Sequence, residues 1–265
     1  MKVTVTIYSF SKLFSRKVVK VKDFVDFCYK LGTDAVDLGY YWESRDEMSE
    51  VKRILKEYGM PVACYITSND FAKLSKAERD SEVEKVKKAV DDAVFMESTK
   101  LRIFAGDYKP GLSYETAKPL VVECLRKVVE YAESNGVILV LENHGRLFGK
   151  IYQIRELLEE ISSPYLKLNF DIGNWMIVGD NPVKAAEELY DSIGHVHVKD
   201  WRIVGGGYRG TTIGEGIVPL KEVLQVLKDR KYDKYLCIEY EGEEDPRLGI
   251  RKSFNNLKNI LLQLK

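Results

Sequence analysis

The sequence predicts an α/β protein, a single (β/α)8 TIM barrel domain that spans residues 1–265. Short β-prone runs alternate with stretches whose apolar residues recur at helical spacing, and eight such units follow one another without a linker rich in Pro, Ser or Gly. This alternation favours a parallel sheet, and eight units in about 250 residues is the size of the barrel. An open doubly wound sheet is the alternative. No GxGxxG motif follows the first strand, so we expect no dinucleotide cofactor.

The expected strands begin 27 to 40 residues apart, which is about the length of one strand–helix unit. In chain order they are residues 3–8, 35–40, 62–67, 101–106, 137–142, 166–171, 195–200 and 235–240. The stretches between them carry the helical pattern. Two of these stretches end at glycines suited to a helix C-terminus, Gly32 and Gly136.

Composition excludes several classes of protein. Lys and Arg number 41, as do Asp and Glu, so no bulk positive charge favours nucleic-acid binding. A hydrophobic fraction of 45% argues against disorder, and the longest apolar runs are far shorter than a membrane span. The first residues lack the apolar block of a secretory signal, and the four scattered cysteines are expected to be reduced core residues. We expect a cytoplasmic protein with no nucleic-acid or membrane partner; a homo-oligomer is compatible with the sequence.

Side chains alternate between the two faces of a strand, and here the alternation separates apolar from polar residues. In run 166–171, for example, Leu166, Leu168 and Phe170 alternate with Lys167, Asn169 and Asp171. If the apolar sets pack on the helices, the polar sets point into the barrel, where charge needs a partner. Near the barrel floor we expect internal salt bridges, such as Lys167 or Arg102 with Asp37. At the carboxyl ends of the strands we expect function, because this fold builds its active site there.

Four residues of the inward sets lie at or near the ends of four consecutive strands. They are Glu142, Asp171, His197 and Glu239. Three carboxylates together repel one another, and one imidazole does not neutralise them, whereas a divalent cation does. Oxygen ligands with one nitrogen suit Mn, Mg, Co or Zn, and the absence of thiolate argues against a closed structural zinc site. The set therefore predicts a site for one divalent metal ion.

Several strings resemble the xylose isomerase-like TIM barrel superfamily of sugar phosphate isomerases and epimerases. They are LENHG at 141–145, NFDIGN at 169–174, GHVHVKD at 194–200, GEG at 214–216 and CIEYEGEEDP at 237–246. The likeness covers most of the chain and is strongest from residue 137 onward. It implies that Glu142, Asp171, His197 and Glu239 bind one metal ion, with His195 as a neighbour of the ligand His197.

The resemblance also implies a mechanism. Glu142 and Glu239 act as base and acid on opposite faces of a substrate whose proton is removed to give an enediolate. Returning the proton to the same carbon epimerises the substrate, and returning it to the neighbouring carbon isomerises it. Many epimerases of the family carry a histidine three residues after the metal-binding aspartate. This chain has Asn174 there, which leaves open how a substrate hydroxyl is held.

Six further residues are candidates for substrate binding, each with a structural alternative. His144 follows Glu142 at even spacing and contacts a substrate oxygen or the backbone. Lys199 contacts substrate or balances the carboxylates, and Arg102 does the same or forms a buried salt bridge. Arg202 lies in the glycine-rich segment 200–219, a long loop that we expect to cover the site; it binds a phosphate or is solvated. Asn174 takes the position of the family's histidine, and Trp175 forms an apolar pocket wall or packs over the barrel rim.

The leading function is a metal-dependent isomerase or epimerase of a small sugar, sugar phosphate or polyol derivative. A dehydratase or lyase of the inosose or dehydroshikimate type is the alternative, because the same enediolate can eliminate water. An apurinic endonuclease is remote, since that branch uses a multi-zinc site rich in histidine and this chain has three histidines and no net charge. A non-catalytic sugar-binding protein needs no pair of opposed glutamates.

Overall fold

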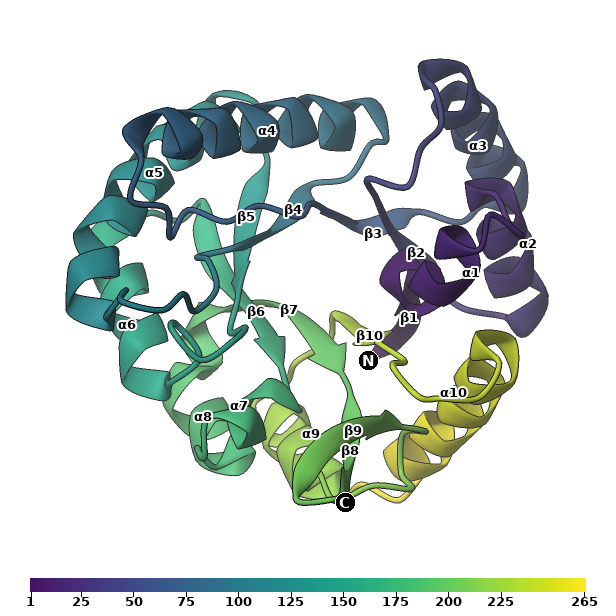
Figure 1. Ribbon diagram of the computed structural model, residues 1–265. Helices are drawn as coiled ribbons and strands as arrows, with labels where there is room; N and C mark the ends of the chain where they lie inside the picture. The colour runs from purple at the N-terminus through teal and green to yellow at the C-terminus, as the bar shows by residue number, and fades with distance from the viewer. The chain divides into compact units, whose positions relative to one another are not determined.

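The computed structural model describes residues 1–265 and has the predicted (β/α)8 barrel topology (Figure 1). Eight parallel strands form a closed barrel in the order β1-β10-β7-β6-β5-β4-β3-β2. The barrel strands are β1 (Lys2–Thr6), β2 (Ala35–Gly39), β3 (Val62–Ile66), β4 (Lys100–Phe104), β5 (Ile138–Glu142), β6 (Leu166–Asp171), β7 (Ile193–Val198) and β10 (Tyr235–Ile238). Each of the eight predicted strands is present, with ends shifted by one or two residues at most positions.

Helices separate the strands along the chain. They are α1 (Ser11–Ser15), α2 (Val21–Leu31), α3 (Arg45–Tyr58), α4 (Lys76–Phe95), α5 (Tyr114–Ser134), α6 (Ile151–Ile161), α7 (Asn174–Ile177), α8 (Pro182–Leu189), α9 (Leu220–Asp229) and α10 (Pro246–Leu262), with 3-10 helices η1 (Ile7–Phe10) and η2 (Tyr190–Ser192). Gly32 ends α2 in the left-handed conformation, with a φ of 79°, as its position in the sequence predicted. The expected strand at 3–8 ends early, because Ile7 and Tyr8 belong to η1.

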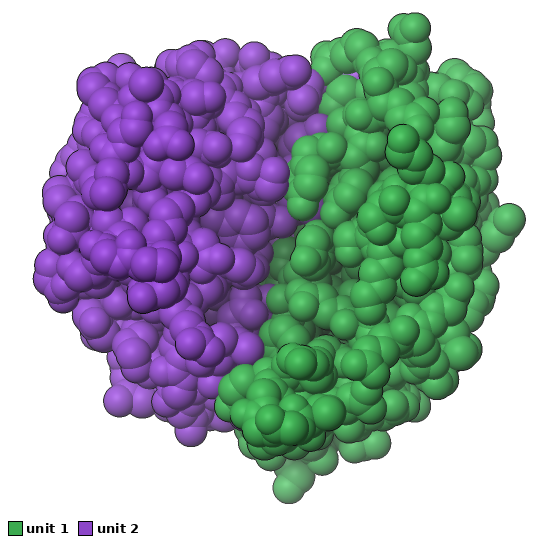
Figure 2. Space-filling view, viewed as in Figure 1, with its two compact units in different colours: residues 1–63, 196–265 green, residues 64–195 purple.

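The chain divides into two compact units, residues 1–63 with 196–265 (unit 1) and residues 64–195 (unit 2) (Figure 2). In unit 2, β4 pairs with β5 and β5 with β6, and helices α4, α5 and α6 pack side by side in chain order (Figure 1). The register sets Phe104 beside Glu142 and Glu142 beside Asn169. These three side chains therefore face the same side of the sheet.

In unit 1, β1 pairs with β2 on one side and with β10 on the other, and β10 pairs with β7. Thr6 lies beside Asp37, and Thr4 lies beside Cys237, which in turn lies beside His197. The apolar residues of the alternate set, such as Val3, Val5 and Leu236, are fully buried on the opposite face. The polar inward set that the sequence predicted is thus present in both units.

Segment 200–219 is more ordered than the long loop that the sequence predicted. Residues Asp200–Val204 (β8) and Gly207–Thr211 (β9) form a two-stranded antiparallel hairpin. The buried carboxylate of Asp200 accepts hydrogen bonds from the backbone N–H groups of Trp201, Gly214, Gly216 and Val218, at 2.9 to 3.1 Å. One acidic side chain at the end of β7 therefore fixes both the start of the hairpin and the chain that follows it.

All four cysteines are buried free thiols, in agreement with the sequence prediction. The helices include none with both the length and the apolar character needed to span a membrane.

We expect Asp200→Ala to lower the free energy of unfolding by about 3 kcal/mol, because the two donors in fully buried hydrogen bonds, the N–H groups of Trp201 and Val218, lose their acceptor, and each unsatisfied group costs roughly 1–3 kcal/mol. Urea unfolding followed by circular dichroism measures the change. Asp233→Ala, which alters an exposed aspartate, serves as the control and is expected to stay within about 0.5 kcal/mol of the unaltered protein. Equal stability of the two variants would contradict the role given to Asp200.

Candidate active site

Unit 2 brings two of the predicted ligands together. Glu142 is the last residue of β5 and Asp171 the last residue of β6, and their side chains are 2% and 0% exposed. Their ligand oxygens lie within 4.8 Å of each other. Two carboxylates this close and this deeply buried require compensating donors or a cation.

The donors around Glu142 come from three elements of unit 2. Arg102, on β4, places its Nε 3.2 Å from Oε2 of Glu142, in a pair of which both side chains are almost completely buried. The amide nitrogen of Asn169 donates to the same oxygen at 3.0 Å, and that of Asn174 donates to Oε1 at 3.4 Å. All three neighbours thus direct hydrogen-bond donors or positive charge at the two oxygens of Glu142.

Asp171 is fixed mainly through the backbone. Its Oδ1 accepts from the backbone N–H of Asn174 at 2.9 Å, at the start of α7. The side chain of Asn143 accepts from the backbone N–H of Asp171 at 2.8 Å and donates to its carbonyl oxygen at 3.0 Å. The sequence prediction did not select Asn143 or Asn169. Asn169 belongs to the inward polar set and could have been found by alternation, whereas Asn143 carries no such signal.

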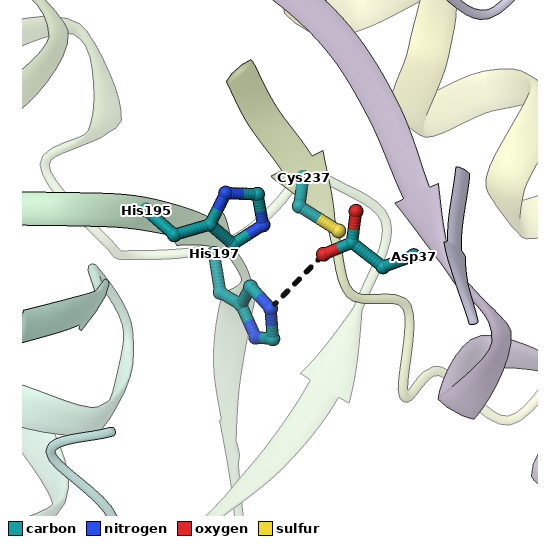
Figure 3. Close-up of side chains that lie close together, drawn as sticks. All are labelled: Asp37, His195, His197 and Cys237. Atoms are coloured by element: carbon teal, nitrogen blue, oxygen red, sulfur yellow. Dashed lines mark ion pairs between the residues drawn. The ribbon is translucent and has the colours of Figure 1, made fainter. Parts of the chain in front are cut away.

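Unit 1 brings the other two predicted ligands together. Nδ1 of His197, on β7, lies 2.7 Å from Oε2 of Glu239, which directly follows β10. Both residues are buried, at 1% and 6% exposure. On its other side, Nε2 of His197 lies 3.7 Å from Oδ2 of Asp37 (Figure 3). Figure 3 also draws Cys237 and His195, the latter two residues before His197 on the same strand. The imidazole of His197 therefore has a carboxylate at each ring nitrogen.

Lys199 supplies the buried positive charge of unit 1. Its Nζ lies 3.4 Å from Oε1 of Glu239 and 2.8 Å from Oε1 of Glu241, and its side chain is 3% exposed. These ion pairs match one of the two roles that the sequence allowed for Lys199, that of balancing carboxylates. Glu241 is thus held by a buried lysine.

Tyr8, in η1 just after β1, is a further polar group that the sequence prediction missed. Burial, with smaller contributions from the negative charges of Glu241 and Glu239, raises the pKa of Tyr8 to about 12. The phenol therefore stays protonated at neutral pH and keeps a hydrogen to donate. Tyr8 also lines a cavity of about 120 Å³ together with Lys12, Tyr240 and Glu241.

The remaining predicted residues take different places. The ring of His144 lies 4.7 Å from that of Phe104, in the loop after β5. Trp175 is fully buried and packs on Phe170 at 5.5 Å, which is the packing role given as its alternative. Arg202 is largely exposed on the hairpin and donates to Glu243 at 2.8 Å, so a surface carboxylate holds its guanidinium.

Each unit thus offers a glutamate beside a second metal-ligating group. Glu142 stands with Asp171, and Glu239 stands with His197. Carboxylate oxygens and an imidazole nitrogen are ligands for Mg, Mn, Co or Zn, so the donor chemistry and the convergence of ligand atoms within each unit fit a divalent metal ion. A carboxylate at such a site can also accept and return a proton.

Comparison with known proteins agrees with this chemistry. The family model described as "Xylose isomerase-like TIM barrel" matches residues 25–260. The 3-dehydroshikimate dehydratase of Bacillus anthracis is 22% identical over 252 residues, which cover 86% of this chain and 88% of that protein. The fructoselysine 3-epimerase of Shigella flexneri is 24% identical over 259 residues, covering 86% and 91%. An inosose dehydratase of Clostridium perfringens is 28% identical over 163 residues, covering 56% and 53%.

Solved structures show the same fold. The IolI protein, solved with a bound zinc atom, superposes with a TM-score of 0.85 at 14% identity, covering 100% of this chain and 99% of that chain. A D-tagatose 3-epimerase-like protein superposes with a TM-score of 0.82 at 22% identity, covering 99% of each. Epimerases and dehydratases both occur among the relatives, so this chain is similar to enzymes of two reaction types.

We expect Arg102→Met to lower the free energy of unfolding by about 3–5 kcal/mol in the presence of a chelator, because it leaves Glu142 as a buried charge without its cation. Urea denaturation measures the effect. The double variant Arg102→Met with Glu142→Gln is expected to regain most of the loss, since no unpaired charge is then buried.

Arg53→Met, which removes an exposed arginine paired with Glu57 on α3, is the matched control for the loss of a guanidinium. Its expected effect is below about 1 kcal/mol. If the double variant were no more stable than Arg102→Met alone, the burial of Glu142 as an ionised carboxylate would be wrong.

Proposed function

Because the chain belongs to the xylose isomerase-like TIM barrel family, we propose that it is a divalent-metal-dependent isomerase or epimerase of a small sugar, sugar phosphate or polyol derivative. One observation carries the proposal. Glu142 and Glu239 are buried glutamates at the carboxyl ends of barrel strands, each paired with a buried cation and each beside a second metal-ligating group. Proton transfer from and back to carbon requires one carboxylate that accepts the proton and one carboxylic acid that returns it, both at the barrel end where this fold builds its active site.

One metal ion is proposed to be held by the four residues that the sequence predicts as ligands, Glu142, Asp171, His197 and Glu239. When bound, it supplies positive charge that stabilises negative charge developing on substrate oxygens. The donor set suits Mn, Mg, Co or Zn. Support comes from the donor chemistry of each unit and from the carboxyl-end location of all four residues, which is where this fold builds active sites.

Proton transfer is assigned to the two glutamates. One glutamate, as the carboxylate, removes the proton from the carbon next to a substrate carbonyl, which gives an enediolate, and the other glutamate, in its protonated form, returns a proton. Return to the opposite face of the same carbon inverts that centre, and return to the neighbouring carbon exchanges aldose for ketose. Arg102 and Asn169 orient Glu142, while Lys199 orients Glu239. Tyr8 keeps a proton that it can donate to a substrate oxygen.

A dehydratase is the second candidate, and the relatives favour it specifically. The similarity to a 3-dehydroshikimate dehydratase extends over 86% of this chain, and inosose dehydratases also align with it. The first step is the same removal of a proton beside a carbonyl. In a substrate with a hydroxyl group on the next carbon, the enediolate then expels that group as water once a protonated side chain supplies the hydrogen. The same residues therefore serve both reactions.

We expect the protein to catalyse exchange of a carbon-bound proton with solvent. Ketoses, sugar phosphates and inososes are incubated in deuterated water with protein loaded with Mn, Mg, Co or Zn, and the products are read by NMR. Converted substrate is expected to carry deuterium at the carbon next to the carbonyl. Absence of deuterium from every carbon of a converted substrate would exclude the proton-transfer mechanism.

Glu142→Gln and Glu239→Gln are each expected to reduce turnover by at least about 100-fold, because an amide neither accepts nor returns the proton. Glu243→Gln is the matched control. It makes the same substitution at an exposed glutamate and is expected to leave turnover unchanged. Full turnover by Glu239→Gln would show that Glu239 does not transfer the proton, and no turnover of any substrate by the unaltered protein would support a binding protein instead of an enzyme. The product separates the two candidate reactions, since dehydration gives a product lighter by one water and isomerisation gives one of unchanged mass.

A further inference from the structure

A buried carboxylate on β2 of unit 1 lies outside the proposed ligand set. Asp37 is 0% exposed. Its Oδ1 accepts a hydrogen bond from the hydroxyl of Thr4, on β1, at 3.3 Å. Its other oxygen, Oδ2, faces Nε2 of His197 at 3.7 Å (Figure 3). An ionised aspartate is costly to bury, so its retention at this point calls for a partner that uses its charge.

The strand register explains how Asp37 reaches His197. Thr6 of β1 lies beside Asp37, and Thr4 of β1 lies beside Cys237, which lies beside His197. Each of these side chains belongs to the inward set, and those of β1 and β10 are short. From these positions, the side chains of Asp37 and His197 approach each other to 3.7 Å. The hydroxyl of Thr4 holds one carboxylate oxygen and leaves the other toward the imidazole.

The two nitrogens of His197 face different carboxylates. Nδ1 lies 2.7 Å from Oε2 of Glu239, a residue of the proposed metal centre, and Nε2 faces Asp37. A neutral imidazole carries one proton, and the nitrogen without it is the one that binds a metal. If Nδ1 shares the metal with Glu239, the proton is on Nε2, where a carboxylate stabilises it. Carboxylates that accept from the second nitrogen of a metal-binding histidine fix its tautomer and orientation.

We propose that Asp37 is a positioning residue that holds the His197 ring with its proton on Nε2 and so leaves Nδ1 to bind the metal beside Glu239. The inference rests on the metal centre of the proposed function. Asp37 itself touches neither metal nor substrate and acts through the imidazole. If Asp37 had only a structural role, replacing it would change the stability of the protein but not its affinity for the metal.

The test compares the unaltered protein with Asp37→Asn, which keeps the size of the side chain and removes its charge. Zinc affinity is measured by competition with a chromophoric chelator. Asp37→Asn is expected to bind zinc about 10 to 100 times more weakly, the usual effect of losing such a partner. Asp233→Asn, at an exposed site, is the control and is expected to bind as the unaltered protein does.

A second readout reports the tautomer directly. The chain has three histidines, so a ¹⁵N–¹H spectrum of the zinc-loaded protein resolves their ring nitrogens. The His197 signals are expected to show a protonated Nε2 in the unaltered protein, and a changed or mixed protonation pattern in Asp37→Asn. A proton on Nδ1 of His197 in the zinc-loaded unaltered protein would overturn the inference.

Unchanged zinc affinity of Asp37→Asn would also overturn it and would leave the proposed function intact. Failure of the unaltered protein to bind any of the four metals would instead defeat the proposed function. Should Asp37→Asn fail to fold, Thr4→Val takes its place, because it removes the hydroxyl that orients the carboxylate. Thr4→Val is then expected to weaken zinc binding severalfold, and affinity equal to that of the unaltered protein would refute the role of Asp37.

Discussion

Burial of ionised carboxylates is the constraint on which the site depends. Glu142 and Glu239 are at most 6% exposed, yet metal binding and proton removal both use the carboxylate anion. Each is therefore compensated within its own unit, Glu142 by Arg102 and Glu239 by Lys199. In the strands that carry the two glutamates, the alternate residues are apolar and pack against the helices. Because side chains alternate between the two faces of a strand, the charged residues then lie on the inner face.

The two units compensate their glutamates in different ways. Arg102 and Asn169 project from strands on either side of β5, and Arg102 also donates to the carbonyl oxygen of Thr67 at 2.8 Å, so Glu142 lies in a rigid frame. Lys199 divides its charge between Glu239 and Glu241. A guanidinium is a planar fork with fixed donor directions, whereas an ammonium is a compact charge on a flexible stem. The ammonium of Lys199 can therefore change its position relative to Glu239 without movement of a strand.

Alternation in the sequence was sufficient to predict the eight strands and the inward orientation of the polar set, because a period of two is imposed by strand geometry whatever the partners are. It did not predict which donor meets which carboxylate. Arg102 was expected to pair with Asp37 and pairs with Glu142 instead, since register along neighbouring strands depends on the whole barrel.

The β8–β9 hairpin was missed because its glycine-rich sequence is equally typical of a loop. The residue that orders it is one aspartate, Asp200, which is hydrogen-bonded to residues up to 18 positions away.

Asn174 links the two acidic residues of unit 2, since its backbone N–H holds Asp171 and its side-chain amide holds Glu142. A neutral amide adds no charge, so the local balance is two carboxylates against the single guanidinium of Arg102. In unit 1, Glu239 and Glu241 pair with the single ammonium of Lys199, and a third carboxylate, that of Asp37, faces His197. Each unit therefore carries more negative than positive charge among these groups. An excess of buried negative charge in both units is the condition under which a divalent cation binds most favourably, because the cation then offsets repulsion that the protein's own cations leave in place.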